Sequence, residues 1–293
     1  MLFQTQIDLK MRVITKVKEM QKVADELRKE GKIIGVVPTM GYLHEGHLSL
    51  IRIAKEKSDV VITTIFVNPL QFAPNEDYDK YPRDLERDVK LAQSAGCDII
   101  FHPSVEEMYP ENFLTYVEVE KLTKVLEGEF RPTHFRGVTT VVAKLFNITK
   151  PHIAVFGQKD AQQALIIKQM VRDLNFDIEI IVAPIVRESD GLAMSSRNVY
   201  LSESERKDAT VLYQSLKLAE KLIEESERNS GVIISKMEEL IKSKPTAKID
   251  YIAIVDPNTL EKVENLSEGK EYLIALAVRI GSTRLIDNTL VKI

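Results

Sequence analysis

One junction near the start of the chain limits what this sequence can fold into. An apolar run at residues 33–37 leads into the turn 38–47, which contains two glycines and two histidines, and the apolar residues of 48–57 then recur at helical spacing. The pattern predicts a buried strand that ends where a helix begins. In an open α/β sheet, ligands bind in the crevice at the carboxyl end of such a strand.

The two histidines of this turn predict a phosphate site. His44 and His47 stand three residues apart, so on a helical turn their imidazoles face the same way and can donate hydrogen bonds to a phosphate as its charge grows. The first turn of a helix adds unpaired N–H groups and the positive end of the helix dipole. Gly46 is expected to leave room for the ligand between the rings.

The same histidines have three other readings. A zinc protease motif, H-E-x-x-H, is absent because its histidines stand four residues apart. A structural zinc would need more ligands, and the single Cys97 supplies little help. The third alternative is that both histidines only cap a helix. We favour the phosphate site because two of the five histidines of the chain fall within four residues, beside two glycines at a strand end.

Length and charge set the class of protein. At 293 residues the chain is long for one core, so we expect two domains, at residues 1–185 and 186–293. A formal net charge of -4 gives no electrostatic footprint for nucleic acid or an anionic membrane. One cysteine cannot form an internal disulfide, and no apolar run approaches the length of a bilayer span, so we expect a cytoplasmic protein. Residues 1–10 lack the apolar core of a signal peptide, and Met11 is a possible alternative start.

Alternating strand and helix patterns predict an α/β domain with a parallel sheet. The run 59–67 is rich in β-branched residues and almost entirely apolar, as in a strand buried on both faces. The other elements expected in this domain are strands at 98–101, 153–156 and 178–182 and helices at 17–27, 83–95, 138–148 and 161–173.

The remainder of the chain predicts a smaller α+β domain. Ser202 and Glu205 form a capping box at the start of a long amphipathic stripe. A second helix is expected at 232–242, followed by strands at 249–255 and 272–278.

Two further strand ends place polar side chains near the histidines. Gln71 follows the strand at 59–67, and because neighbouring strand ends of one sheet lie side by side, its amide can point into the same crevice. A second strand–glycine–helix junction carries Lys159, a point charge suited to phosphate, with Gln163 one turn further on. Neither G-x-x-x-x-G-K-[ST] nor G-x-G-x-x-G occurs, so ATP, if bound, is held in another way.

Several charged residues have two readings. Asp84 and Asp88 share a helix face and form either a solvated acidic surface or part of a magnesium site. Arg131 and His134 stand in the polar, glycine-bounded segment 127–137, which we expect to be a loop that either closes over an anionic ligand or carries surface charges.

The loop after the last strand of the first domain also stays open to two interpretations. Ser195, Ser196 and Arg197 are groups that hold phosphate, but the same residues fit a serine-rich linker. Arg279 and Arg284 of the second domain could reach the cleft, but we expect them at the surface by default.

Four segments of the chain together carry a family resemblance. They are Met40-Gly41-Tyr42-Leu43-His44-Glu45-Gly46-His47, Asn68-Pro69-Leu70-Gln71-Phe72, Gly157-Gln158-Lys159-Asp160 with Gln163, and Met194-Ser195-Ser196-Arg197-Asn198. In this order and spacing they resemble the pantothenate synthetases, also called pantoate-β-alanine ligases, from about Val13 to the end of the chain. The H-x-G-H element alone is shared by the wider nucleotidyltransferase superfamily and class I aminoacyl-tRNA synthetases.

The resemblance implies a Rossmann-like N-terminal domain, a smaller C-terminal domain that lids it, and a homodimer. It implies an ATP- and magnesium-dependent condensation of pantoate with β-alanine through a pantoyl adenylate, with release of AMP and pyrophosphate. By this resemblance His47 is the catalytic acid, His44 and Lys159 assist catalysis, and Gln71 and Gln163 bind pantoate. The residues implied to hold ATP are Met40, Gly41, Tyr42, Leu43, His44, Glu45, Gly46, His47, Gly157, Gln158, Lys159, Asp160, Val186, Met194, Ser195, Ser196 and Arg197.

The chemistry of these residues agrees with that reaction. A carboxylate that attacks the α-phosphorus must approach a negatively charged triphosphate. Cations such as Lys159 and magnesium must therefore neutralise part of the triphosphate charge. Neutral amides at Gln71 and Gln163 suit an acid that bears hydroxyls. A nucleotidyltransferase acting on a phosphorylated acceptor is the nearest rival and would need basic residues at these two positions. A catalytically silent nucleotide-binding module is the second rival.

Overall fold

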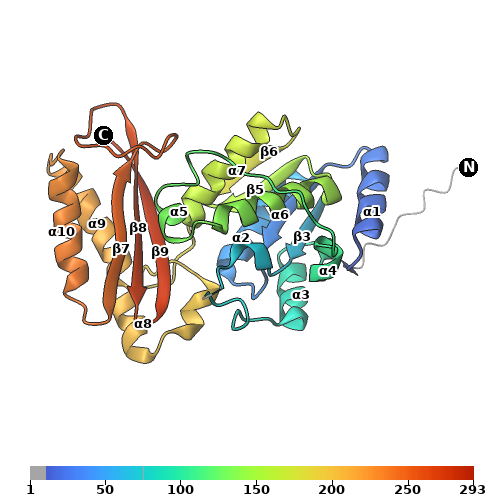
Figure 1. Ribbon diagram of the computed structural model, residues 1–293, viewed down its shortest axis with the longest axis horizontal. Helices are drawn as coiled ribbons and strands as arrows, with labels where there is room; N and C mark the ends of the chain where they lie inside the picture. Colours follow the sequence, from blue (N-terminus) through green and yellow to red (C-terminus); the bar gives the residue numbers. More distant parts are fainter. Residues whose placement is uncertain (1–10, 75) are drawn as a thin grey trace, which may run out of the picture.

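Two β-sheets of different type organise the chain (Figure 1). The computed structural model describes residues 11–74 and 76–293, so the expectations for residues 1–10 lie outside the described part. A six-stranded parallel sheet between helices forms the larger part, and a three-stranded antiparallel sheet with its own helices forms the smaller part. The predicted fold class, a Rossmann-like parallel sheet with a smaller α+β part, is confirmed.

The parallel sheet has the strand order β1-β4-β3-β2-β5-β6. Its strands are β1 Arg12–Ile14, β2 Ile34–Thr39, β3 Val60–Ile65, β4 Ile99–Phe101, β5 Ile153–Gly157 and β6 Glu179–Ala183. Within β2 and β3, successive residues belong to different cores: Val36 and Ile62 face one, and Val37 and Val61 face the other. Both faces are therefore dry, which explains the uninterrupted apolar runs.

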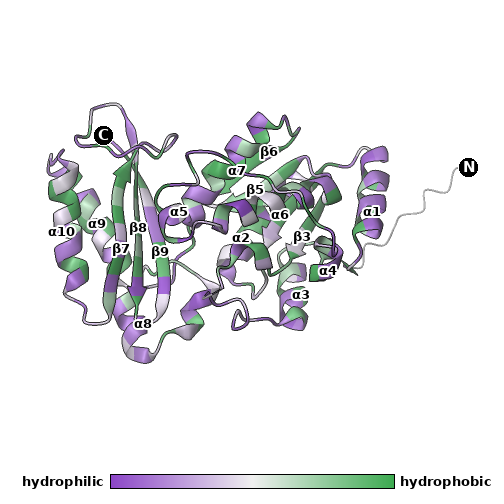
Figure 2. Ribbon diagram, viewed as in Figure 1, coloured by the Kyte–Doolittle hydropathy of each residue, from purple (hydrophilic) through white to green (hydrophobic). Residues whose placement is uncertain are grey.

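Helices cover both faces of this sheet. The helices in this part of the chain are α1 Val17–Lys29, α2 Glu45–Lys57, α3 Leu85–Ser94, α4 Val105–Met108, α5 Glu127–Phe130, α6 His134–Thr149 and α7 Ala161–Asp173, with short 3₁₀ turns η1 Pro69–Gln71, η2 Gln158–Asp160 and η3 Ser196–Tyr200. Buried residues of α1, α6 and α7 share one core, and those of α2 and α3 share the other. Figure 2 shows the result, with hydrophobic colour on the strands and hydrophilic colour on much of the outer surface of α1.

The sheet of the smaller part packs against its own helices and against the core of the larger part. The smaller part consists of α8 Glu203–Ala209, α9 Val211–Glu224, α10 Ser230–Lys242, β7 Ala247–Val255, β8 Glu271–Ile280 and β9 Thr283–Lys292, with the sheet antiparallel in the order β7-β8-β9. Ile254 and Leu276 pack with α9 and α10, whereas Val255 and Leu273 join the core of the larger part. The small sheet is thus fixed to the parallel-sheet part by shared apolar contacts.

The structure differs from the expected elements in several places. Strands β1 and β9 were not expected, and α2 begins at Glu45 rather than near residue 48. The segment 127–137, expected to be a loop, contains α5 and the start of α6. Among the described residues, no helix is both long and apolar enough to cross a membrane.

The single cysteine of the sequence belongs to the core on the α2 side of the sheet. Cys97 is 5% exposed, and its Sγ lies 3.1 Å from the carbonyl oxygen of Ile99. Burial raises the pKa of this thiol. The side chain therefore behaves as a small apolar group of the core.

Candidate active site

The site lies where the order of the strands reverses. β2 pairs with β3 on one side and with β5 on the other. From β2 the chain first adds β3 and β4 on one side and then adds β5 and β6 on the other side. Such a reversal opens a crevice at the carboxyl ends of the strands. The turn 40–47 after β2 and the turn 157–160 after β5 meet there.

Two adjoining cavities occupy this crevice. The smaller one has a volume of about 220 Å³ and lies at the ends of β2 and β5. The larger one, of about 700 Å³, extends between the parallel-sheet part and the small sheet. Residues that line both cavities are Arg131, His134, Lys159, Asp160, Gln163, Ser195 and Arg197.

The structure brings most of the predicted site residues into the smaller cavity. Its lining includes Met40, His44, Gly46, His47, Gln71, Gly157, Lys159, Asp160, Gln163, Val186, Met194, Ser195, Ser196 and Arg197. Five of the predicted residues line neither cavity: Gly41, Tyr42, Leu43, Glu45 and Gln158. Leu43 is fully buried, and the Glu45 carboxylate forms an ion pair with Arg52 at the surface.

The histidine pair caps helix α2 and faces the cavity at the same time. The Gly46 N–H donates to His44 Nδ1 at 3.2 Å, and the His44 N–H donates to His47 Nδ1 at 3.3 Å. Because a backbone N–H can only donate, both Nδ1 atoms are acceptors and both rings carry their proton on Nε2. The capping interpretation of the sequence is therefore confirmed, and the phosphate site stays a prediction for the same two residues, which also line the cavity.

Gly46 makes room for an imidazole of the protein. A Cβ atom at this position would lie 2.8 Å from His44 Cε1 and 2.9 Å from His44 Nδ1. The two rings lie with their centroids 4.0 Å apart. Gly46 was expected to leave room for a ligand, but its immediate neighbour is the ring of His44.

Both imidazoles are neutral at physiological pH in this structure. Burial and the nearby Lys159 ammonium lower the pKa of His44 to about 4. Burial, followed by His44 and Lys159, lowers the pKa of His47 well below its usual value. Each neutral ring offers one N–H donor from Nε2, so the fixed positive charge at this cavity comes from lysine and arginine rather than from histidine.

Asp88 holds the histidine turn in place. Its carboxylate accepts the N–H groups of Tyr42 and Leu43, each at 2.7 Å, and its side chain is 1% exposed. Asp88 lines neither cavity. Of the two readings from the sequence, a solvated acidic surface does not describe Asp88, and its oxygens are directed to backbone amides rather than toward a metal-binding position.

Hydrogen bonds fix the side chain of Gln71, which lines the smaller cavity. Its Oε1 accepts from Asn68 Nδ2 at 3.1 Å, and its Nε2 lies 3.1 Å from Met40 Sδ, a weak acceptor. Asn68 also donates to the carbonyl oxygen of Gly137 at 3.0 Å, which ties the turn after β3 to helix α6. The Gln71 amide group therefore keeps donor capacity for a ligand.

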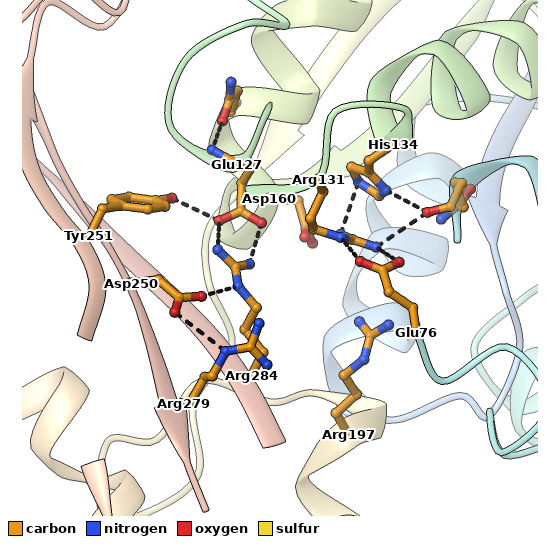
Figure 3. Close-up of polar contacts among 12 residues, drawn as sticks. Glu76, Glu127, Arg131, His134, Asp160, Arg197, Asp250, Tyr251, Arg279 and Arg284 are labelled. Atoms are coloured by element: carbon orange, nitrogen blue, oxygen red, sulfur yellow. Dashed lines mark hydrogen bonds and ion pairs between the residues drawn. The ribbon is translucent and has the colours of Figure 1, made fainter. Parts of the chain in front are cut away.

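Arg131 and His134 are anchored parts of the wall (Figure 3). Arg131 forms a bidentate ion pair with Glu76 at 2.6 and 2.9 Å, and its side chain is 14% exposed. His134 Nδ1–H donates to the Gln71 carbonyl oxygen at 2.9 Å and its Nε2 accepts from Arg131, and burial lowers its pKa. These contacts hold the segment in place, so it is not the loop that the sequence suggested.

Both charged and apolar side chains line the smaller cavity. Lys159 lies 3.9 Å from the half-exposed Asp160 carboxylate, the single carboxylate among the described lining residues. Arg197 forms a bidentate ion pair with Asp77 at 2.8 and 2.9 Å. The apolar wall comes from Val138, Val141, Val142 and Leu145 of α6 and from Phe66 and Phe156.

A second group of ion pairs crosses the larger cavity and was missed by the sequence analysis (Figure 3). Arg284 of β9 binds the Glu127 carboxylate at 2.5 and 2.9 Å and Asp250 at 2.7 Å, and its side chain is 14% exposed. Asp250 sits at an irregularity of β7, where the register with β8 shifts. The prediction of a surface position for Arg284 is wrong, because its acidic partners come from distant parts of the chain. Arg279, which lies 3.4 Å from Asp250, is 44% exposed, as expected.

Comparisons with known proteins agree with this geometry. A family model described as "Pantoate-beta-alanine ligase" matches residues 12–290. A pantothenate synthetase of Thermoanaerobacter sp. (strain X514) is 61% identical over 280 residues, which are 96% of this chain and 98% of the relative.

Two solved structures are similar over nearly their whole length. A pantothenate synthetase from Thermus thermophilus is 46% identical with a TM-score of 0.89, over 95% of this chain and 99% of that one. A pantoate-beta-alanine ligase from Francisella tularensis, complexed with beta-gamma ATP and beta-alanine, is 39% identical with a TM-score of 0.79, over 96% and 97% of the two chains.

Proposed function

Because the chain belongs to the pantoate-β-alanine ligase family of enzymes, we propose that it joins pantoate to β-alanine in two steps at the paired cavities. In the first step a pantoate carboxylate oxygen attacks the α-phosphorus of ATP, the bond from that phosphorus to the bridging oxygen breaks, and pyrophosphate leaves. In the second step the amine of β-alanine attacks the acyl carbon of the pantoyl adenylate, the carbon–oxygen bond breaks, and AMP and a proton leave.

The presence of two amides, apolar side chains of α6 and cationic side chains in the lining of one cavity is the observation that carries this proposal. Gln71 and Gln163 present neutral amides beside the apolar wall of α6, which suits a branched hydroxy acid. Lys159 and the two imidazoles lie in the same cavity and suit phosphate. A neutral amide leaves the electron density of the attacking carboxylate intact, whereas an ammonium in its place would draw that density away.

The triphosphate would be held by fixed donors. The Nε2–H groups of His44 and His47 are set by the capping hydrogen bonds, so they need no reorganisation to donate to phosphate oxygens. Lys159 and Arg197 supply positive charge at the same cavity. We assign His47 as the donor to the leaving pyrophosphate through its Nε2–H, as charge develops there, because an imidazolium would need a second proton on Nδ1, which already accepts the His44 N–H.

Magnesium fits this site as an ion that arrives with the nucleotide. Among the described residues, no group of three or more His, Cys, Asp or Glu side chains could hold a metal ion. Asp160, which lines both cavities, is the carboxylate we assign to it, and phosphate oxygens would complete its shell. When bound, the ion would neutralise developing charge on the phosphates.

The larger cavity is our proposed route for the nucleotide and the amine. The Francisella relative was crystallised with a nucleotide and β-alanine together, which supports a common site. Basic side chains at Arg131 and Arg197 line both cavities and can attract anionic ligands toward Lys159. The homodimer, the cytoplasmic location and the domain division at residues 185 and 186 remain proposals, and the dimer is tested by light scattering of the purified protein.

Isotope exchange between pyrophosphate and ATP tests the first step. We expect exchange that depends on pantoate, and pantothenate on addition of β-alanine. His47→Ala and Lys159→Ala should each lose orders of magnitude of exchange while the fold survives. Exchange that depends on a phosphate ester would replace this proposal with a nucleotidyltransferase, and a protein that binds ATP without any exchange would be a silent binding module.

A further inference from the structure

Asn288 of β9 contacts the turn that carries Lys159. Its side-chain Nδ2 donates to the carbonyl oxygens of Gln158 at 2.9 Å and Lys159 at 3.0 Å, and its Oδ1 accepts from Gln158 Nε2 at 3.0 Å. Asn288 is 3% exposed. All hydrogen-bonding groups of the Asn288 side-chain amide are thus directed to the turn 157–160, which belongs to the parallel-sheet part of the protein.

The neighbouring residue fixes Asn288 in turn. Asp287 accepts the Asn288 N–H at 2.8 Å and forms a bidentate ion pair with Arg187 at 2.6 and 2.9 Å. Arg187 follows Val186 and also donates to the carbonyl oxygen of Gly191 at 3.0 Å. Two segments that line the site, 157–160 and 186–197, are therefore tied to the same two residues of β9.

The turn has little else to determine where Lys159 points. It is a short 3₁₀ segment between β5 and α7, and a Cβ added to Gly157 would meet no atom within 4 Å. The contact of Lys159 Nζ with Asp160 is long, at 3.9 Å. Because this contact is long, the backbone of the turn sets the region that the flexible Lys159 side chain can reach.

We propose that Asn288 is a positioning residue for the adenylation step, because its two N–H donors hold the backbone of Gln158 and Lys159 where the Lys159 ammonium meets the nucleotide. This inference rests on the proposed function, which assigns Lys159 to phosphate. The small sheet is then part of the catalytic apparatus and not only a cover over it. A misplacement of about 1 Å at a reacting site lowers rates by as much as 100-fold.

The test combines Asn288→Ser with Lys159→Ala in a double-mutant cycle. Serine has one short donor that cannot reach both carbonyl oxygens. We expect Asn288→Ser to lower kcat for pantoate-dependent exchange by roughly 10- to 100-fold and to change the KM for pantoate by less than about 2-fold, because Gln71 and Gln163 are untouched. In the Lys159→Ala background, assayed at high enzyme concentration, Asn288→Ser should cost less than about 2-fold, because the group it positions is gone.

Thr289→Val is the matched control. Thr289 is the next residue of β9, and its hydroxyl donates to Glu220 of α9 at 2.8 Å, within the smaller part of the protein. This variant loses one hydrogen bond without touching the Lys159 turn, so its exchange rate should stay near that of the wild type. Thermal unfolding of all variants checks folding, and Asn288→Thr, which fills more of the site, replaces the serine variant if that one melts below the assay temperature.

Three results would overturn the inference. They are a normal kcat for Asn288→Ser, an equal loss with and without Lys159, and a loss confined to the KM for pantoate. If Lys159→Ala alone keeps wild-type exchange, the proposed function of Lys159 fails, which is a separate outcome. A loss for Asn288→Ser that vanishes in the Lys159→Ala background supports the positioning role.

Discussion

Gly137→Ala should destabilise the protein and impair pantoate binding, although intrinsic helix propensity predicts the opposite. Gly137 lies in the first part of α6, and in a solvated helix alanine is favoured over glycine by about 1 kcal/mol. Here an added Cβ would lie 2.3 Å from the carbonyl oxygen of Leu70 and 2.6 Å from the amide nitrogen of Gln71. Both are backbone atoms, so no change of rotamer relieves the contact.

The size of the effect follows from these distances. Ordinary contacts of a Cβ begin at about 3.4 Å, so the turn that carries Gln71 must move by about 1 Å. Overpacking of this kind costs about 1–3 kcal/mol, and two backbone atoms closer than 3 Å place this site toward the upper end, so that after the gain of about 1 kcal/mol in helix propensity the net loss is up to about 2 kcal/mol. The movement also strains the hydrogen bond from Asn68 to the Gly137 carbonyl and shifts the Gln71 amide, for which we expect a fall of up to about 100-fold in kcat/KM for pantoate.

Denaturant unfolding and steady-state kinetics measure the two effects separately. Gly231→Ala in α10 is the matched control, because the nearest atom to its added Cβ is a side-chain oxygen of Asn229 at 3.1 Å. This variant should keep the wild-type kinetics and be as stable as the wild type or slightly more so. A Gly137→Ala protein with unchanged stability and unchanged kcat/KM for pantoate would refute the reasoning, because it would show that helix and turn do not touch as closely as described.

Three further predictions concern charged groups. The pKa of His44 is lowered to about 4 in the folded protein, so as pH falls from about 6.5 the unfolded chain takes up a proton before the folded one does. The wild type should therefore lose roughly 3 kcal/mol more stability between pH 6.5 and 4 than His44→Asn, which keeps a cap acceptor and does not titrate. Denaturant unfolding at several pH values measures this difference. In Asp88→Asn the side chain can accept a hydrogen bond from only one of the two backbone N–H groups, so the variant should lose about 1.5–3 kcal/mol of folding stability. It should also have a raised KM for ATP, while the half-maximal magnesium concentration for activity should stay unchanged. Arg284→Ala leaves the Glu127 carboxylate buried without its cation, while Asp250 keeps Arg279 at 3.4 Å, and it should cost about 3–5 kcal/mol in denaturant unfolding. Glu127→Gln in the same chain should restore part of this loss.

The sequence predicted the parts of the fold and site that local patterns determine. The β-branched run of β3 and the amphipathic helices are encoded within single segments, and so are the two strand–glycine–helix junctions. Because parallel strands align their carboxyl ends at one edge, the placement of His47, Lys159 and Gln71 around one cavity followed from the order of the elements. The capping of α2 by its own histidines was one of the readings the sequence left open.

Contacts between distant segments could not be predicted in this way. Arg284 resembles a surface residue in its local sequence, and its burial depends on Glu127, which is 157 residues away. The segment that contains Arg131 and His134 resembles a loop because its polar residues find their partners in Glu76 and the Gln71 carbonyl. Strand β9 carries the polar residues Arg284 and Asn288, which have hydrogen-bond partners in the larger part of the protein, so the alternation expected of a strand was hidden.

The buried state of Cys97 makes this protein convenient for distance measurements by thiol labelling. The thiol is enclosed in the core with a raised pKa, so maleimide reagents should leave it unmodified in the folded protein. Cysteines introduced at the exposed positions Lys29 of α1 and Ser235 of α10 would then be the reactive pair, one on each part of the molecule. Fluorophores at these positions would report whether the two parts approach each other when a nucleotide binds.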